Sequence, residues 1–129
     1  MQEATYSDLH AEALTRLSNE IHADNLKAGW YTDHTTGLPK VMNDGERFML
    51  MVSEIAEAME GNRKNLMDDK LPHRKMEEVE MADAVIRIFD YCGWKGYDIG
   101  GAVEEKRAYN AVRSDHKLEN RVKPGGKAY

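Results

Sequence analysis

The sequence of 129 residues is poor in the residue types that stabilise small secreted or β-rich domains. It contains one cysteine, Cys92, together with three prolines and two phenylalanines. A single cysteine excludes an internal disulfide and favours a reducing, cytoplasmic setting. The scarcity of proline and phenylalanine, beside eight methionines, favours helices over a β-sandwich.

Long apolar runs are also missing. No apolar stretch approaches the roughly 18 residues of a membrane-spanning helix. Met1 is followed by Gln-Glu-Ala-Thr rather than by a basic and then apolar run. We therefore expect neither a signal peptide nor a membrane span.

The net charge of −5 is unevenly distributed. Residues 1–103 carry 11 basic and 19 acidic side chains, net −8, whereas residues 104–129 carry 7 basic and 4 acidic ones, net +3. An acidic body argues against binding to a nucleic-acid duplex. A basic end suits a small polyanion such as a metal-bound phosphate chain, or it is a solvated tail without a role.

The periodicity predicts an all-α fold, a bundle of four to five helices in one domain over residues 1–129. Ser7 is expected to cap a first helix to about residue 25, and Trp30 to Val41 to form a long loop. Asn43, with Glu46 three residues later, opens a second helix that runs to residue 60 and stops at Gly61. The third helix is predicted over residues 72–92 and the fourth over 99–114, capped by Asp98. Residues 117–129 are expected to form an extended arm.

Two acidic pairs mark the middle of the sequence: Glu54 with Glu57, and Glu80 with Asp83. The i, i+3 spacing places both carboxylates of a pair on one helix face, beside the apolar stripe. Because burial of unpaired carboxylates is unfavourable, we expect a cation between them, and four oxygen ligands from two antiparallel helices suit Mg²⁺ or Mn²⁺. From spacing alone, two solvated acidic helix faces are an equally good interpretation.

The acidic helices and a later basic helix together carry a family resemblance. Glu-x-x-Glu, 22 residues and then Glu-x-x-Asp, followed by the segment 105–113 and Asp115-His116-Lys117, resemble the MazG-like all-α nucleotide pyrophosphohydrolases of the small single-domain type found in bacteria and phages. The resemblance covers residues 43–117; residues 1–42 match only as a helix followed by a Gly-Trp loop. It implies a Mg²⁺-dependent hydrolase that converts a (d)NTP to the (d)NMP and pyrophosphate. It also implies homodimers or homotetramers, but no base preference, because dUTP- and dCTP-directed members share the acidic core.

The resemblance also implies roles for individual residues. Glu54, Glu57, Glu80 and Asp83 are the expected metal ligands and catalytic residues, with Glu57 the candidate base for the attacking water. Lys106, Asn110 and Arg113 share one helix face and are expected to bind phosphate oxygens, together with Lys117. Trp30 and Asn25 are candidates for stacking on a base and reading its edge. An exposed polar helix face, and a core or interface position for Trp30, are the alternatives.

Two other functions compete with the hydrolase. The first is a non-enzymatic helical interaction or adaptor module with a vestigial metal site; inward-facing carboxylates argue against it. The second is a metal-storage bundle of the di-iron type, which needs Glu-x-x-His pairs that the sequence does not have at the acidic motifs.

Overall fold

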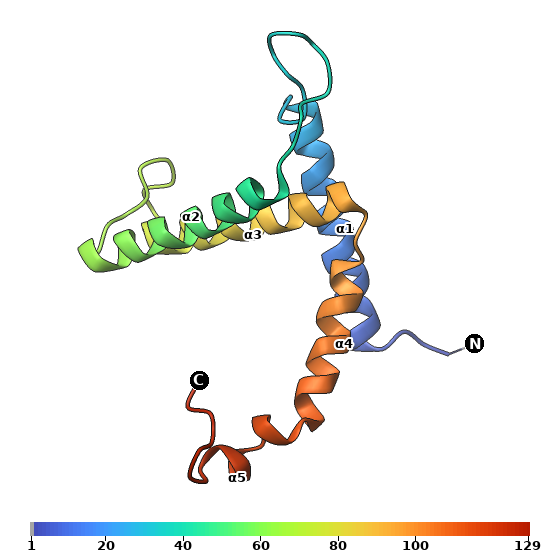
Figure 1. Cartoon of the computed structure of the whole chain (residues 1–129), viewed down its shortest axis with the longest axis vertical. Helices are drawn as coiled ribbons and strands as arrows, with labels where there is room; N and C mark the ends of the chain where they lie inside the picture. The colour runs from blue at the N-terminus through green and yellow to red at the C-terminus, as the bar shows by residue number, and fades with distance from the viewer. Residues whose placement is uncertain (1) are drawn as a thin grey trace. The chain divides into compact units, whose positions relative to one another are not determined.

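The computed structural model describes residues 2–129, and its regular elements are helices (Figure 1). They are the α-helices α1 (Tyr6–Lys27), α2 (Asp44–Lys64), α3 (Met76–Lys95), α4 (Ile99–Val112) and α5 (Leu118–Arg121), with the 3-10 helix η1 (Ser114–His116) between the last two. Residues 2–129 contain no β-strand, only two isolated bridges, Thr32 with Pro39 and Met67 with Lys75. The predicted all-α class is confirmed. None of the helices in this range combines the length and apolar character that crossing a membrane requires.

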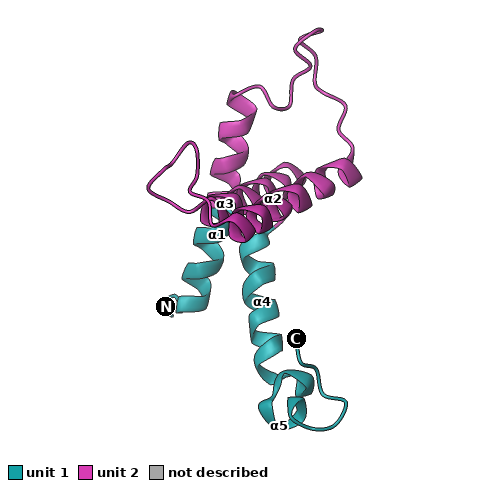
Figure 2. Ribbon diagram, turned by 90° about the vertical axis from the view of Figure 1, so that its left-hand side faces the viewer, with its two compact units in different colours: residues 1–16, 98–129 teal, residues 17–97 magenta. Residues whose placement is uncertain are grey.

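The chain forms two compact units, coloured separately in Figure 2. The first unit consists of the residues up to 16 and residues 98–129. The second unit, residues 17–97, contains the rest of α1, the loop after it, α2 and α3.

In the second unit, α2 and α3 lie side by side and antiparallel, as the sequence predicted (Figure 1). Lys95 at the end of α3 pairs with Asp44 at the start of α2, with Nζ and Oδ2 2.9 Å apart. At the other end, Gly61 of α2 lies directly against Met76: a Cβ built on Gly61 would be 2.9 Å from the Met76 side chain. This close approach explains why a glycine occupies the helix interior despite its low helix propensity.

The C-terminal half of α1 packs across α3. Ser18 Oγ donates a hydrogen bond to the carbonyl oxygen of Phe89. A Cβ built on Gly93 would be 2.9 Å from the Ser18 carbonyl oxygen, so only glycine allows the two helices to come this close. The contact fixes the end of α1, and with it the loop of residues 28–43.

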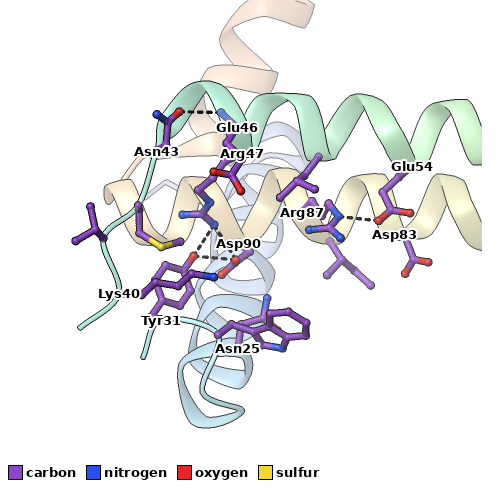
Figure 3. A pocket seen from close by; sticks show the side chains of 15 residues that line it. Asn25, Tyr31, Lys40, Asn43, Glu46, Arg47, Glu54, Asp83, Arg87 and Asp90 are labelled. Atoms are coloured by element: carbon purple, nitrogen blue, oxygen red, sulfur yellow. Dashed lines mark hydrogen bonds and ion pairs between the residues drawn. The ribbon is translucent and has the colours of Figure 1, made fainter. Parts of the chain in front are cut away.

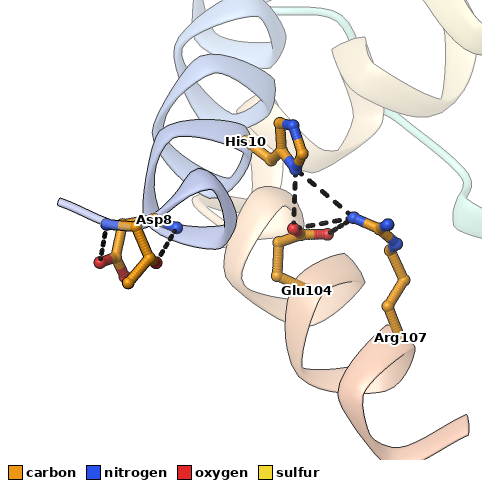
Figure 4. A network of polar contacts seen from close by, with 5 residues as sticks. Asp8, His10, Glu104 and Arg107 are labelled. Atoms are coloured by element: carbon orange, nitrogen blue, oxygen red, sulfur yellow. Dashed lines mark hydrogen bonds and ion pairs between the residues drawn. The ribbon is translucent and has the colours of Figure 1, made fainter. Parts of the chain in front are cut away.

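The first unit joins the N-terminal half of α1 to α4. Thr15 Oγ1 donates to Asp98 Oδ1 at 2.8 Å, and Asp98 accepts in turn from the backbone nitrogen of Gly101, which caps α4 as predicted. Glu104 is buried and accepts from Arg107, while His10 Nδ1 lies 3.0 Å from Glu104 Oε1 (Figure 4). These polar contacts, rather than a large apolar core, hold α1 and α4 together.

Several predicted helix ends are wrong by two to four residues. α1 is capped by Thr5, whose hydroxyl accepts from the backbone nitrogen of Asp8, and not by Ser7. α2 continues past Gly61 to Lys64 and ends on Asn65 in the left-handed conformation. α3 likewise continues through Gly93 to Lys95 and ends on Gly96.

The beginning of α3 and the end of the chain also differ from the prediction. Pro72 lies in a loop, because Asp68 Oδ2 accepts from the backbone nitrogens of Lys70 and Leu71 and holds a turn before α3 begins at Met76. The C-terminal segment is not simply an extended arm, since α5 forms within it. Arg121 donates to the carbonyl oxygens of Lys127 and Ala128, folding the tail back on α5.

Candidate functional site

Three of the four predicted carboxylates converge between α2 and α3. Glu54 and Glu57 come from α2 and Glu80 from α3. Each offers one carboxylate oxygen, and these three oxygens lie within 4.8 Å of one another. The antiparallel pairing of the two helices brings the pairs together, because the start of α3 lies beside the second half of α2, as the close approach of Gly61 to Met76 shows. We call Glu54, Glu57 and Glu80 the acidic cluster.

The electrostatics of the acidic cluster are those of a site that attracts positive charge. Burial, followed by hydrogen bonds with Glu54 and Glu57, raises the pKa of Glu80 to about 8. Burial opposes ionisation of Glu54, but hydrogen bonds from Arg87 and from Glu80 outweigh it and lower the pKa of Glu54. In the metal-free protein, therefore, a proton on Glu80 takes the place of a cation between the carboxyl groups.

One oxygen of the acidic cluster has no partner. Glu80 Oε2 is buried and accepts no hydrogen bond from any of the residues 2–129. Hard divalent cations such as Mg²⁺ and Mn²⁺ prefer carboxylate oxygens, and a buried oxygen without a donor is what such an ion would satisfy. The residues present therefore fit a divalent cation.

Asp83, the fourth predicted ligand, lies on α3 one turn beyond Glu80. It is not part of the acidic cluster, yet the charges of Glu54 and Asp68 act on it: burial, and then these two charges, raise the pKa of Asp83. Asp68 is itself buried, in the loop before α3. Asp83 is thus close enough to the acidic cluster for the charge of Glu54 to raise its pKa. Asp83 also lines a pocket.

That pocket has a volume of about 530 Å³ and lies in the second unit (Figure 3). Its walls come from the end of α1, the following loop, α2 and α3. Its lining includes Glu54 of the acidic cluster, the neighbouring Asp83, and Asn25 and Trp30 from the region predicted to read a base. Trp30 is 65% exposed in the single chain, so of its two alternative positions the core one is wrong and the interface one stays a prediction. A pocket of this size can enclose a nucleotide-sized ligand.

A buried ionic network supports one wall of the pocket. Asp90 accepts from His22 Nδ1 at 3.0 Å, from the Tyr31 hydroxyl at 2.8 Å and from Arg47 at 2.9 Å. The Arg47 guanidinium also lies over the Trp94 ring, 4.7 Å from its centroid. The network joins α1, the loop, α2 and α3. Asp90, at its centre, is buried.

Arg87 is the site residue that the sequence reasoning missed. It lies on α3 one turn after Asp83, lines the pocket, and donates from Nε to Glu54 Oε1 at 2.7 Å (Figure 3). The spacing of Glu80, Asp83 and Arg87 was the available signal, because i, i+3 and i+7 share a helix face.

The predicted phosphate-binding residues belong to the first unit. Lys106 Nζ lies 4.6 Å from the centroid of the Tyr109 ring. Arg113 donates to both carboxylate oxygens of Asp115, and to Asn110 Oδ1 at 3.2 Å. Lys117 is exposed after η1. Lys106 and Asn110 also line a shallow pocket of about 330 Å³ on α4.

Comparison with protein-family models, with curated proteins and with solved structures finds no match for this chain.

Proposed function

We propose that the protein is a divalent-metal-dependent nucleoside triphosphate pyrophosphohydrolase, which cleaves a (d)NTP to the (d)NMP and pyrophosphate. The observation that carries the proposal is the acidic cluster, with its unpartnered buried Glu80 oxygen, whose member Glu54 lines a pocket large enough for a nucleotide. The resemblance of the acidic and basic helices to MazG-like pyrophosphohydrolases supports the same function.

Glu54, Glu57 and Glu80 would hold the cation, and Asp83 stands beside them as a further ligand. A bound Mg²⁺ or Mn²⁺ would neutralise phosphate oxygens and lower the pKa of a bound water. Glu57 is the most exposed member of the acidic cluster, so its carboxylate can take the proton of the attacking water. The water oxygen forms a bond to phosphorus, the bond between the α- and β-phosphoryl groups breaks, and pyrophosphate leaves with the electron pair.

The remaining predicted substrate contacts keep their proposed roles. Trp30 and Asn25 line the pocket and would face the base, by stacking and by hydrogen bonding respectively. The role predicted for Lys106, Asn110, Arg113 and Lys117 of the first unit, binding of phosphate oxygens, stays a prediction; Arg113 already pairs with Asp115. A reducing cytoplasm supplies nucleotides and Mg²⁺, and it is compatible with the single buried thiol of Cys92.

We further propose that the protein is a homodimer or homotetramer. Large apolar side chains of α2 and α3 are exposed, among them Met49 at 63% and Met59 at 60%. A second copy that covers these faces would remove apolar surface from water. The same exposed faces favour the competing function, a non-enzymatic interaction module with a vestigial metal site.

One experiment separates the two functions. The eight common NTPs and dNTPs are incubated with the protein and Mg²⁺, and the products are identified. The hydrolase yields a monophosphate and pyrophosphate, loses all turnover in excess chelator, and is inactive as Glu57→Ala. Glu60→Ala is the matched control, since Glu60 lies one turn further along α2 and pairs with Lys64 instead. Absence of turnover with every nucleotide would leave the interaction module as the function.

A further inference from the structure

We propose that Arg87 binds the phosphate adjoining the nucleoside, so that a nucleotide lies in the pocket with its base toward Trp30 and its phosphates toward the acidic cluster. The proposal rests on the proposed function for the identity of the ligand class. It assigns a phosphate-binding role to a residue of the second unit, whereas the side chains predicted from the sequence to bind phosphate all belong to the first unit.

The first argument is the set of hydrogen bonds that Arg87 makes. Its Nε donates to Glu54 Oε1, which orients the guanidinium beside the acidic cluster. Among residues 2–129, no hydrogen bond is found from its two terminal nitrogens, and the side chain is 40% exposed. A guanidinium presents five donors, so most of its capacity to bind an oxyanion is left for a ligand.

The second argument is the state of the other cations that line the pocket, Arg47 and Lys40. Arg47 is already engaged by Asp90 and Tyr31, and its remaining terminal nitrogen is buried. Lys40 comes from the loop, at the end of the pocket where Tyr31 and Asp90 lie (Figure 3). Arg87 is therefore the accessible cation at the end formed by Glu54 and Asp83.

The third argument is the order of the charged side chains from one end of the pocket to the other. Along α3, Asp83, Arg87 and Asp90 follow one another at intervals of about one turn, and Figure 3 shows Arg87 between Glu54 on one side and Asp90 on the other. A cation held by the acidic cluster requires the phosphate chain at that end. The base is then left to the end with Trp30 and Asn25, and the phosphate nearest the sugar comes to Arg87.

Ligand binding without catalysis tests the proposal. The affinities of AMP, CMP, GMP, UMP and their deoxy forms, and of the matching nucleosides, are measured by NMR titration in EDTA, for wild type, Arg87→Met, Arg87→Lys and Lys40→Met. We expect wild type to bind the preferred monophosphate more tightly than its nucleoside. Arg87→Met should lose at least tenfold in monophosphate affinity while its nucleoside affinity stays within twofold, and Arg87→Lys should retain part of the difference. Arg74→Met is the matched control, because Arg74 pairs with Glu78 on the exposed surface.

Three results would overturn the assignment: an Arg87→Met protein that binds the monophosphate as wild type does, a wild type that binds no monophosphate more tightly than its nucleoside, or loss of the phosphate contribution in Lys40→Met instead. The last result would mean that the nucleotide lies in the opposite direction. Hydrolysis of triphosphates by wild type, measured in parallel, is a separate readout. A protein that hydrolyses nucleotides but shows no Arg87 effect keeps the proposed function and loses this inference. A protein that binds monophosphates through Arg87 without hydrolysing triphosphates keeps this inference and loses the proposed function.

Discussion

The buried network around Asp90 provides the sharpest test of how this fold is stabilised. Replacing Asp90 by Asn keeps the shape of the side chain and removes its charge. In the wild type, both carboxylate oxygens face donors, with His22 at one and Tyr31 and Arg47 at the other. Whichever way the new amide is oriented, its NH₂ group meets a donor. The Arg47 side chain, only 12% exposed, is left without a counter-charge.

The expected loss of stability follows from these contacts. Removing one partner of a buried ion pair typically costs about 3–5 kcal/mol. The aromatic rings around Arg47 continue to stabilise its charge, by about 1 kcal/mol. We therefore expect Asp90→Asn to lower the free energy of unfolding by about 3 kcal/mol, which corresponds to roughly 10 °C in Tm for a chain of this size.

Urea unfolding followed by far-UV circular dichroism, at one fixed protein concentration, measures this loss. Asp69→Asn is the matched control, because the same chemical change at an exposed position of the loop should shift stability by less than about 0.5 kcal/mol. The double variant Asp90→Asn/Arg47→Met leaves no unpaired charge, so its loss should be smaller than the sum of the two single losses. A loss below about 1 kcal/mol in Asp90→Asn, or strict additivity in the double variant, would refute the reasoning.

Three further predictions concern the acidic cluster, the helix contact and the assembly. Because the pKa of Glu80 is raised from 4.5 to about 8, this carboxyl contributes most to the stability of the metal-free fold below about pH 4.5, and the contribution falls as the pH rises from there to about 8. Since Mg²⁺ displaces the proton, calorimetry should show that the affinity of the protein for Mg²⁺ rises about tenfold per pH unit from pH 6 to 8 and is constant above pH 8. Glu80→Gln should remove this pH dependence. Gly61→Ala should lower thermal stability by about 1–3 kcal/mol despite a better helix propensity, because the new Cβ meets Met76; an unchanged melting curve would contradict the close packing. Light scattering at micromolar concentration should give a dimer or tetramer, and a stable monomer would count against the proposed assembly.

Features that depend on neighbours in the chain could be predicted from the sequence. The helical period gave the all-α class. The Asn43 cap is confirmed, with Glu46 donating its backbone nitrogen to the Asn43 side chain at 2.9 Å, and so is the Asp98 cap of α4. The i, i+3 pairs placed two carboxylates on each of two helix faces. Each of these signals acts within one turn of helix, so no tertiary contact is needed to read it.

Glycine and proline were misleading for a physical reason. Gly61 and Gly93 look like helix breaks because glycine lowers helix propensity. In the fold they are the positions at which two helices touch, and the gain from close packing outweighs the propensity cost. Pro72 is equally compatible with a first helical turn and with a loop. The Asp68 turn, which the sequence did not reveal, decides for the loop.

Only the tertiary structure decided which charged side chains are buried or brought together, and where the pocket forms. A lone acidic residue reads as surface charge in a sequence, yet Asp90 is buried because His22 and Arg47 reach it from positions 68 and 43 residues away. The convergence of Glu54, Glu57 and Glu80 likewise depends on the register between α2 and α3. The pocket that Arg87 lines forms only where α1, the loop after it, α2 and α3 come together. Burial and distance are properties of packed segments, and for that reason the sequence by itself determined the helices and the candidate carboxylates but not the site that they form.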